Sequence, residues 1–485
     1  MTIAILGGGL AGLSAAYYLK HEGKIQNNQA IQIIEVNNNT GGWIQSWKNE
    51  KSKIVTELGP RTIRGRGNSA NNTYSLIKDL GIENLVRHVD IDATARYIYA
   101  KGNVHQLPTN FWKALFAVNR PFTKPWIHYV LREFFSSNNS NIILSKTQKS
   151  DESAYDFFSR TYGQEFADYL ISPLLCGVCG GDAKEISVKF MFGALYEAKQ
   201  KHGSVGFGLL KEKLNTYWTP KKVKNSEETY NFKPPPSVYY LEGGLQVLIN
   251  ALHTKNQSQG INIQLNTECS ELHFHENGGL RIMLSNGQHL ECSHVISALP
   301  AHKLASCVSF QHSKLTQLLN SIPTVSIATV NLTYDNPNVI DSYKGFGVLA
   351  SPMENLSLLG IIFNNCIYGH KKSVDLTVMM GGYAFKDNFL HNSKCLSNDK
   401  LTQIAMDHVK RVLNITLSPT TYTTQVLHNC IPQYTIGHYE RVTKIQDYIT
   451  NKRLPLTLVG SSYTGISIND VIYSSMIAMR KFCRR

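Results

Sequence analysis

Three glycines near the N-terminus have the spacing of a phosphate-binding turn. Gly7, Gly9 and Gly12 form G-x-G-x-x-G directly after the apolar run at residues 2–6 and at the start of a helical pattern at residues 11–21. The first glycine of such a turn allows the tight bend, the second lets a phosphate approach the backbone, and the third lets helix and strand pack closely. The N–H groups and positive dipole end of the helix then attract the phosphate. The expected dinucleotide contacts here also include Gly8, Leu10 and Ala11.

An acidic residue at the end of the next predicted strand supports this interpretation. Residues 31–36 have the composition of a buried strand, and Glu35 lies at its end, where a carboxylate accepts hydrogen bonds from ribose hydroxyls. Strand, helix, second strand and terminal acid together are far more specific than the glycines alone. The unit suits NAD or FAD equally, and a glycine-rich loop without a nucleotide is the less favoured alternative.

Two later segments favour FAD. The glycines of GGW (41–43), followed by ELGPRTIRG (57–65), are similar to a second glycine signature of flavoproteins. Arg61 is expected to meet pyrophosphate or flavin charge, and its alternative is an ordinary surface arginine. Residues 454–470 read as a strand, a small-residue turn and a helix from about Asn469, which would present backbone N–H groups to the flavin as reduction adds negative charge. The FAD contacts expected from these segments are Gly42, Trp43, Gly59, Pro60, Arg61, Thr62, Ser461, Ile466, Ser467 and Ile468.

The composition is that of a folded protein of two or three domains. The chain has 485 residues, of which 42% are hydrophobic and 17% charged. Its net charge of +14 suits an acidic ligand or an anionic membrane, and no nucleic-acid-binding motif is present, so nucleic acid is not expected as a partner. Helical patterns dominate residues 90–215, and residues 280–292 read as a β-hairpin turning at Asn286-Gly287. No apolar stretch is long enough to span a bilayer, and because a strand is predicted at residue 2, a cleavable targeting peptide is not expected.

The nine cysteines are expected to be reduced thiols. Cys176 and Cys179 have the C-x-x-C spacing of redox or metal sites, but no second C-x-x-C follows to complete a zinc site. Packed thiols are therefore favoured over a redox pair, and no metal is expected. His428 and His438 are interpreted as structural rather than as general bases.

Seven blocks carry a resemblance to a known family. They are GGGLAGLSAAYYL (7–19), GGWIQS (41–46), ELGPRTIR (57–64), HVISALPA (294–301), GFGVL (345–349), HNCIPQYTIGH (428–438) and RLPLTLVGSSYTGISINDVI (453–472). Through them the chain resembles the protoporphyrinogen oxidase family, in its oxygen-using mitochondrial and related bacterial form. The resemblance implies an α/β flavoprotein with the two-dinucleotide-binding-domain fold of p-hydroxybenzoate hydroxylase and the amine oxidases. It also implies an FAD-binding domain (1–90, 237–300 and 425–485), a helical membrane-binding insert (91–215) and a β-rich substrate-binding domain (301–424).

The reaction implied by the resemblance is the six-electron oxidation of protoporphyrinogen IX to protoporphyrin IX, the penultimate step of haem biosynthesis. Non-covalent FAD accepts hydride in three rounds and molecular oxygen reoxidises it to give hydrogen peroxide, so no side chain is assigned as catalytic. The substrate-binding residues implied are Arg96, Gly177, Phe346, Gly347 and Leu349. Arg96 would bind a propionate of the substrate; the alternative is that it is an ordinary solvated arginine. The strand at residues 345–349 would pack against the macrocycle; the alternative is that it belongs only to the strand core. Cys176 replaces a basic residue of the family, which leaves the charge on the substrate side open.

The resemblance also implies partners and a location. Phe111–Arg132 interleaves aromatic and basic residues, as in a peripheral membrane surface, and the alternative is a solvated helix face. The implied location is the mitochondrial inner membrane on its intermembrane-space side, or the plasma membrane in a bacterium. A homodimer and contact with the next enzyme of haem synthesis are further expectations. The other functions considered are a flavin amine oxidase or carotenoid desaturase of the same fold, and a non-catalytic flavin- or haem-binding membrane adaptor.

Overall fold

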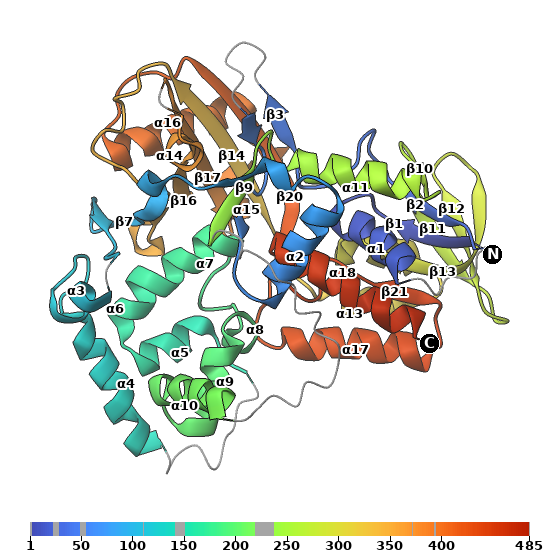
Figure 1. Ribbon diagram of the computed structural model, residues 1–485, viewed down its shortest axis with the longest axis horizontal. Coiled ribbons are helices and arrows are strands. Elements are labelled where there is room, and N and C mark those ends of the chain that lie inside the picture. Colours follow the sequence, from blue (N-terminus) through green and yellow to red (C-terminus); the bar gives the residue numbers. More distant parts are fainter. Residues whose placement is uncertain are drawn as a thin grey trace.

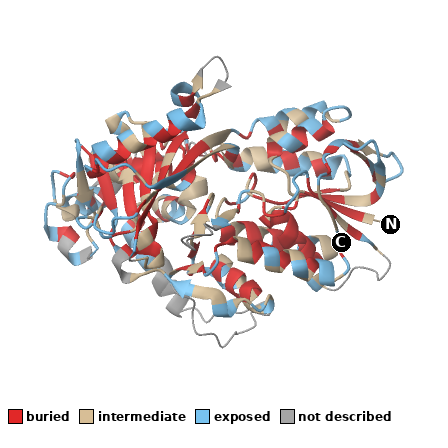
Figure 2. Cartoon of the chain, turned by 90° about the horizontal axis from the view of Figure 1, so that it is seen from above, coloured by how far each residue is buried: buried red, intermediate tan, exposed pale blue. Residues whose placement is uncertain are grey.

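The computed structural model describes residues 2–22, 29–48, 55–109, 111–140, 151–218, 237–370, 372–391 and 394–484. Figure 1 shows two large sheets side by side, with a group of helices beside the second sheet and both chain ends at the far side of the first. Buried residues fill the two sheets and the helices packed against them (Figure 2). The mixed α/β fold agrees with the sequence prediction.

The first sheet has the strand order of a dinucleotide-binding domain. Its parallel part runs β10 (Asn262–Gln264), β2 (Ile31–Ile34), β1 (Thr2–Leu6), β13 (His289–Ser297) and β21 (Leu456–Leu458). In order of sequence these strands lie 3-2-1-4-5, so the order reverses between β1 and β13, where such sheets bind ligands at the carboxyl ends of the strands. The long β13 also pairs with an antiparallel extension, β12 (Leu280–Leu284) and β11 (Cys269–Phe274). The predicted hairpin at Asn286-Gly287 is confirmed as the turn from β12 to β13.

Helices α1 (Leu10–His21) and α18 (Ile468–Cys483) pack together over this sheet, and α11 (Gln246–Ser258) packs on the other side of α1. The strand predicted at residues 2–6 and the helix predicted at 11–21 are confirmed. Nearly every residue of α1 is buried, because it lies between the sheet and its neighbouring helices. Its apolar composition all around the helix reflects that position. Leu13, Ile5 and Ile472 belong to one continuous core.

The second sheet has the order β20 (Thr421–Pro432), β14 (Thr324–Tyr334), β17 (Val374–Gly382), β16 (Leu358–Phe363), β15 (Gly347–Ala350), β7 (Tyr97–Ala100) and β8 (Asn103–Gln106). All neighbours are antiparallel except the parallel pair β15 and β7. Helix α16 (Asn398–Leu413) covers one face, where Val330, Val378 and Leu401 share a core. The opposite face meets α7 (Ser172–Cys179).

The remaining elements connect these layers. The helical group comprises α3 (Phe111–Phe116), α4 (Trp126–Ser140), α5 (Ala154–Thr161), α6 (Gln164–Phe166), a π-helical turn (Ala167–Ile171), α7, α8 (Val188–Met191), α9 (Gly193–His202) and α10 (Val205–Trp218). The other helices are α2 (Asn68–Asp79), α12 (Ala301–Val308), α13 (Ser313–Asn320), α14 (Asn364–Tyr368), α15 (Phe385–Phe389) and α17 (His438–Asn451). The short strands are β3 (Ser46–Lys48), β4 (Val55–Glu57), β5 (Ile63–Arg64), β6 (Val86–His88), β9 (Val238–Leu241), β18 (Leu390–His391) and β19 (Lys394–Cys395).

Candidate active site

The glycine loop between β1 and α1 leaves no space for side chains. Gly7 has a φ of +98°, and its N–H donates to the Ile34 carbonyl at 2.8 Å. A Cβ at Gly12 would lie 1.9 Å from the Gly7 carbonyl oxygen, so the helix can sit this close to the loop only with glycine there. Helix α1 begins at Leu10 after Gly9 without a side-chain cap. Its first-turn N–H groups are therefore left for an external acceptor such as a phosphate.

Glu35 is positioned directly beside this loop. Its side chain is buried, and Oε2 accepts a 2.6 Å hydrogen bond from the Gly8 N–H. Oε1 accepts from the backbone N–H and the side-chain amide of Asn37, at 2.9 Å and 2.7 Å. A carboxylate offers about four acceptor positions, so one remains for a further donor such as a ribose hydroxyl.

The second glycine segment folds back onto the first. The Gly41 N–H donates to the Gly8 carbonyl at 2.9 Å, which brings Gly42 next to Gly9. A Cβ at Gly59 would lie 2.1 Å from the Trp43 carbonyl oxygen, so the segment leading to Arg61 passes close behind GGW. The Trp43 side chain and Pro60 are exposed, whereas Thr62 is half-buried. The two glycine segments thus form one continuous cradle.

Arg61 is a buried cation at the end of this cradle. It is 7% exposed, so the surface-arginine alternative is wrong. Its Nη1 donates to Asn364 Oδ1 at 2.8 Å, which links the cradle to α14, directly after strand β16 of the second sheet. Burial raises the pKa of nearby Glu57 to about 7, and the Arg61 guanidinium opposes that rise. An arginine stays charged even when burial lowers its pKa, so Arg61 remains a buried cation beside Glu57.

The late turn after β21 reaches the same edge of the sheet. The Val459 N–H donates to the Ser297 carbonyl at 3.0 Å, and Gly460 lies against Ala11 in the first turn of α1. Ser467 caps α18, because its Oγ accepts from the Asp470 N–H at 3.2 Å. Ile466 is half-buried and Ile468 buried beside this cap. The turn thus brings the N-terminus of α18 to the edge of the sheet that holds the glycine loop.

Two of the predicted substrate residues form one pair at the end of β7. The Arg96 guanidinium carbon lies 4.5 Å from the centre of the Phe346 ring. Arg96 Nη1 also donates to the Ala93 carbonyl at 2.6 Å, and the Phe346 N–H donates to the Ala95 carbonyl at 2.9 Å. These bonds hold a cation against an aromatic face, an arrangement that can present both to a ligand.

The other predicted substrate residues meet one strand further along. A Cβ at Gly177 on α7 would lie 2.3 Å from Leu349 Cδ2, so the helix and the strand are in direct contact. Gly347 precedes Leu349 on β15 and crosses close to the Ile361 carbonyl of β16. The five residues therefore lie along β15 and its neighbours but on two faces of the sheet, because Phe346 packs against the core shared with Val348, whereas Leu349 contacts α7.

The cysteine pair and His438 have structural surroundings. Cys176 and Cys179 donate to the carbonyls of Gly181 and Leu175, at 3.4 Å and 3.1 Å. Burial raises the pKa of both thiols, that of Cys179 to about 11, which keeps them protonated and unreactive. Among the residues that the structure describes, no group of three His, Cys, Asp or Glu side chains could hold a metal ion. His438 is fully buried, and burial lowers its pKa to about 4.

The segment after β20 joins the helical group to the late turn. The Gln433 side chain donates to the Cys179 carbonyl at 2.9 Å, and the Ser187 N–H donates to the Tyr434 carbonyl at 2.8 Å. The Tyr434 hydroxyl donates to the Ser461 carbonyl in the late turn. Sequence reasoning recognised this block only by resemblance and assigned it no contacts. It gave no signal at all for Asn364, the partner of Arg61.

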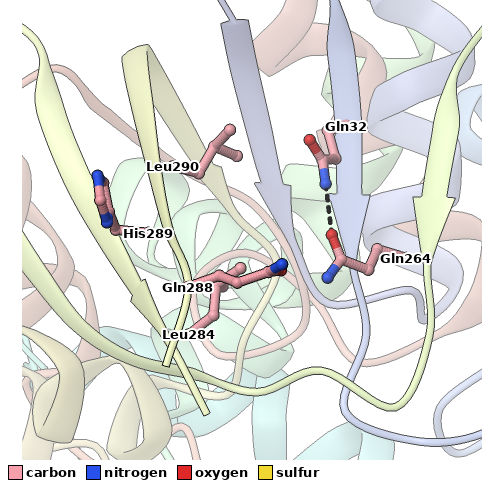
Figure 3. A pocket seen from close by; sticks show the side chains of 6 residues that line it. All are labelled: Gln32, Gln264, Leu284, Gln288, His289 and Leu290. Atoms are coloured by element: carbon pink, nitrogen blue, oxygen red, sulfur yellow. Dashed lines mark hydrogen bonds between the residues drawn. The ribbon is translucent and has the colours of Figure 1, made fainter. Parts of the chain in front are cut away.

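Two hollows lie outside the predicted site. One of about 430 Å³ is lined by Gln32, Gln264, Leu284, Gln288, His289 and Leu290, with Gln32 and Gln264 hydrogen-bonded at 2.6 Å (Figure 3). The other, of about 290 Å³, lies between the helical group and the loops of the second sheet, and its lining includes Tyr155, Asp168 and Met353. Neither lining contains a predicted cofactor or substrate residue, so the site is defined by the contacts above.

Comparison with known proteins assigns this arrangement to a class. The family described as "Flavin containing amine oxidoreductase" matches residues 10–478, so the chain belongs to that family. Protoporphyrinogen oxidase of Homo sapiens is 32% identical over 481 residues, which cover 98% of this chain and 96% of the human protein. At that identity and coverage, the chain is a member of the protoporphyrinogen oxidase family.

Two further comparisons concern a related substrate and the fold. Coproporphyrinogen III oxidase of Bacillus subtilis is 26% identical over 474 residues, covering 97% of this chain and 95% of the bacterial protein. The solved structure of cyclohexylamine oxidase from Brevibacterium oxydans has a TM-score of 0.68 at 12% identity, covering 100% of this chain and 98% of that one. The likeness to cyclohexylamine oxidase shows that the two chains share a fold.

The cofactor of this flavoenzyme is FAD, and the residues of the cradle fit it. The fit rests on the glycine loop that a Cβ would fill, the uncapped start of α1 and the spare acceptor position on Glu35. An oxidoreductase of this family needs little acid–base chemistry from side chains, because the cofactor carries the electrons.

Proposed function

We propose that this protein oxidises protoporphyrinogen IX to protoporphyrin IX by six electrons, with one non-covalent FAD per chain and molecular oxygen as the final acceptor. The observations that carry the substrate class are the Arg96–Phe346 pair directly before β15 and the contact between Leu349 and Gly177 further along that strand. A flat apolar ring with carboxylates at its rim needs an apolar wall with a cation at one end. The names of the relatives support the same substrate class.

Each part of the site has its own task in this reaction. Bound FAD accepts hydride and passes electrons to oxygen. The glycine loop and Arg61 hold its phosphates, Glu35 holds its ribose, and the start of α18 stabilises negative charge at the edge of the ring. Arg96 fixes a propionate of the substrate, and Leu349 and Phe346 exclude water from the ring.

Coproporphyrinogen III is the second candidate substrate, because relatives of that name cover nearly the whole chain. It differs in carrying four propionates instead of two, so a site that holds the Arg96 cation at one rim and apolar side chains beyond it favours protoporphyrinogen. The test is the ratio of kcat/KM for the two porphyrinogens, measured by porphyrin fluorescence with peroxide as the second product. A ratio in favour of coproporphyrinogen would contradict this choice.

Arg96 provides the sharper test of the site. In the Arg96→Leu variant, we expect KM for protoporphyrinogen to rise by about tenfold, since a charge-assisted hydrogen bond contributes about 1.5–3 kcal/mol. Arg87→Leu is the matched control, because Arg87 lies on the surface in an ion pair with Glu242. Equal KM values for the two variants would remove Arg96 from the substrate site.

A peripheral membrane surface is part of the proposal. The exposed large apolar side chains of α3, α4 and α10 are Trp112, Phe116, Val130, Leu131, Phe134, Phe207, Leu209 and Leu210. Helices α4 and α10 are joined by the buried Glu133, which accepts from the Val205 N–H at 2.8 Å and pairs with Lys199 at 3.1 Å. Apolar side chains on a basic chain suit an anionic lipid surface. No helix among the described residues is long and apolar enough to cross a bilayer.

Vesicle binding tests this surface. We expect the double variant Trp112→Ser, Phe116→Ser to lose most of its binding to vesicles of anionic phospholipid, because these side chains are 70% and 68% exposed. Phe310→Ser is the control, since Phe310 is 75% exposed but lies at the end of α12. An equal loss of vesicle binding in both variants would refute the proposal that α3 lies on the membrane. The same proposal includes a homodimer and contact with the next enzyme of haem synthesis. It also includes a location at the mitochondrial inner membrane, on the side that faces the intermembrane space, or at the plasma membrane of a bacterium.

A further inference from the structure

One face of the second sheet continues the predicted substrate wall across four more strands. Leu349 lies opposite Gly360, Gly360 opposite Met379, Met379 opposite Thr329, and Thr329 opposite Gln425. Directly opposed residues point to the same face, and neighbouring strands lie about 4.8 Å apart. The side chain of Thr329 therefore shares a row with Leu349, and Met379 lies between them.

This face is distinct from the packed core of the sheet. The alternate residues Ala328, Val330 and Val378 point to the other face, where they share a core with helix α16. Met379 and Leu349 are only partly buried, whereas Ala328, Val330 and Val378 are fully buried. The row thus lies on the face that meets α7, where Met379 packs beside a small cluster that includes Cys176 and Ile327, and not on the face that α16 covers.

Polar atoms on this row, and on the next row of the same face, are buried without partners in the protein. Thr329 is 4% exposed and Asn331 7% exposed. The atoms Thr329 Oγ1, Asn331 Nδ2 and Gln425 Oε1 have no hydrogen-bond partner. An unpaired buried polar group costs free energy, so such a group is normally satisfied by a ligand or water. Three of them on two neighbouring strands mark a place that receives polar atoms from outside the chain.

A chain of hydrogen bonds ties this place to the cofactor cradle. Arg61 donates to Asn364, the Asn364 side-chain amide donates to Thr377 Oγ1 at 2.8 Å, and Thr377 donates to Asn331 Oδ1. These side chains are all buried. Asn331 is therefore held in one orientation by the residue that faces the cofactor, and it stands next to Thr329 on the same strand face.

We propose that Thr329, Asn331 and Gln425 form a polar subsite that binds the reduced tetrapyrrole ring in preference to the oxidised one; this inference rests on the proposed function. A porphyrinogen has saturated carbon bridges, so its pyrroles tilt and their N–H groups point out of the ring. Thr329 Oγ1 and Gln425 Oε1 accept hydrogen bonds from these N–H groups, with Asn331 fixing their surroundings. The product is flat and keeps its N–H groups inside the ring. The subsite therefore favours substrate over product and aids product release.

The experiment compares two variants that remove the same kind of hydroxyl. Thr329→Val removes the unpaired hydroxyl from the subsite. Thr161→Val is the matched control, because Thr161 Oγ1 is also buried and unpartnered but lies on α5. Gln425→Met is the second subsite variant, of similar shape and without an amide. For each protein, KM for protoporphyrinogen is measured by porphyrin fluorescence, and the Kd of protoporphyrin IX by titration.

We expect Thr329→Val and Gln425→Met to raise KM for protoporphyrinogen by about fivefold, the effect of one neutral hydrogen bond, and to leave the Kd of protoporphyrin unchanged. Thr161→Val should change neither value. If the wild type oxidises protoporphyrinogen and the three variants behave alike, the subsite is refuted. A parallel change in KM and in the product Kd would also refute it, because the preference for the reduced ring would be absent. A wild type that binds FAD but does not oxidise the substrate refutes the proposed function itself.

Discussion

Replacing Gly12 with alanine tests the cradle at the point where it is tightest. The new Cβ would lie 1.9 Å from the Gly7 carbonyl oxygen, whereas real Cβ contacts are at least 3.0 Å, so loop and helix must separate by about 1.1 Å. Gly7 is fixed by its bond to Ile34, so the loop cannot move without losing that bond. Overpacking of this kind costs about 1–3 kcal/mol, and the better helix propensity of alanine offsets about 1 kcal/mol.

The net loss of stability from Gly12→Ala is therefore about 0–2 kcal/mol, but the shift falls on the phosphate-binding N–H groups. We expect FAD affinity to fall by at least about tenfold, equal to about 1.4 kcal/mol. The assay is flavin absorbance per chain after dialysis, together with FAD titration of the apoprotein. Gly193→Ala is the matched control, because Gly193 is also helical and its Cβ would meet nothing within 4 Å. Gly12→Ala protein with the FAD affinity of the wild type would refute the assignment of the cradle.

Three other substitutions test the packing around the site. Burial lowers the pKa of His438 to about 4 in the folded protein, from 6.5 in the unfolded chain, so the unfolded chain binds more protons between these pH values. The free energy of unfolding should therefore fall by about 3 kcal/mol as pH drops from about 6.5 to 4. In urea unfolding, the His438→Gln variant should lack this part of the pH dependence. Glu133→Gln should cost about 3–5 kcal/mol, because it leaves the Lys199 ammonium in a buried position without its carboxylate; an unchanged Tm would contradict this. Tyr434→Phe removes the donor to the Ser461 carbonyl and should lower stability by about 1 kcal/mol, measured in the same way, while a neutral effect would show that this bond does not hold the late turn.

Local elements could be predicted because their signals lie within a few residues. The strand at residues 2–6, the helix from about residue 11 and the hairpin at Asn286-Gly287 follow from hydrophobic period and turn chemistry. Glu35 could be placed at the end of its strand for the same reason. Helix α18 begins at Ile468, one residue before its predicted start.

Long-range pairings could not be predicted from these signals. Arg61 and Asn364 are 303 residues apart, and nothing in the pattern of either segment names the other. The sequence left Arg61 either on the surface or in the site, because its burial is decided by distant residues, among them Asn364 and Tyr368 of α14. The unpaired atoms of Thr329 and Asn331 were likewise invisible, since a Thr-x-Asn strand pattern is equally typical of a solvated sheet face.

The most direct test of the central claim is the anaerobic reduction of the bound flavin by protoporphyrinogen, followed by admission of oxygen. We expect the purified chain to carry about one FAD, and the flavin absorbance to bleach on mixing with protoporphyrinogen. On admission of oxygen, it should return as porphyrin fluorescence and peroxide appear together. A flavin that a primary amine bleaches and protoporphyrinogen does not would contradict the proposed reaction, and a chain that binds no FAD would contradict the site itself.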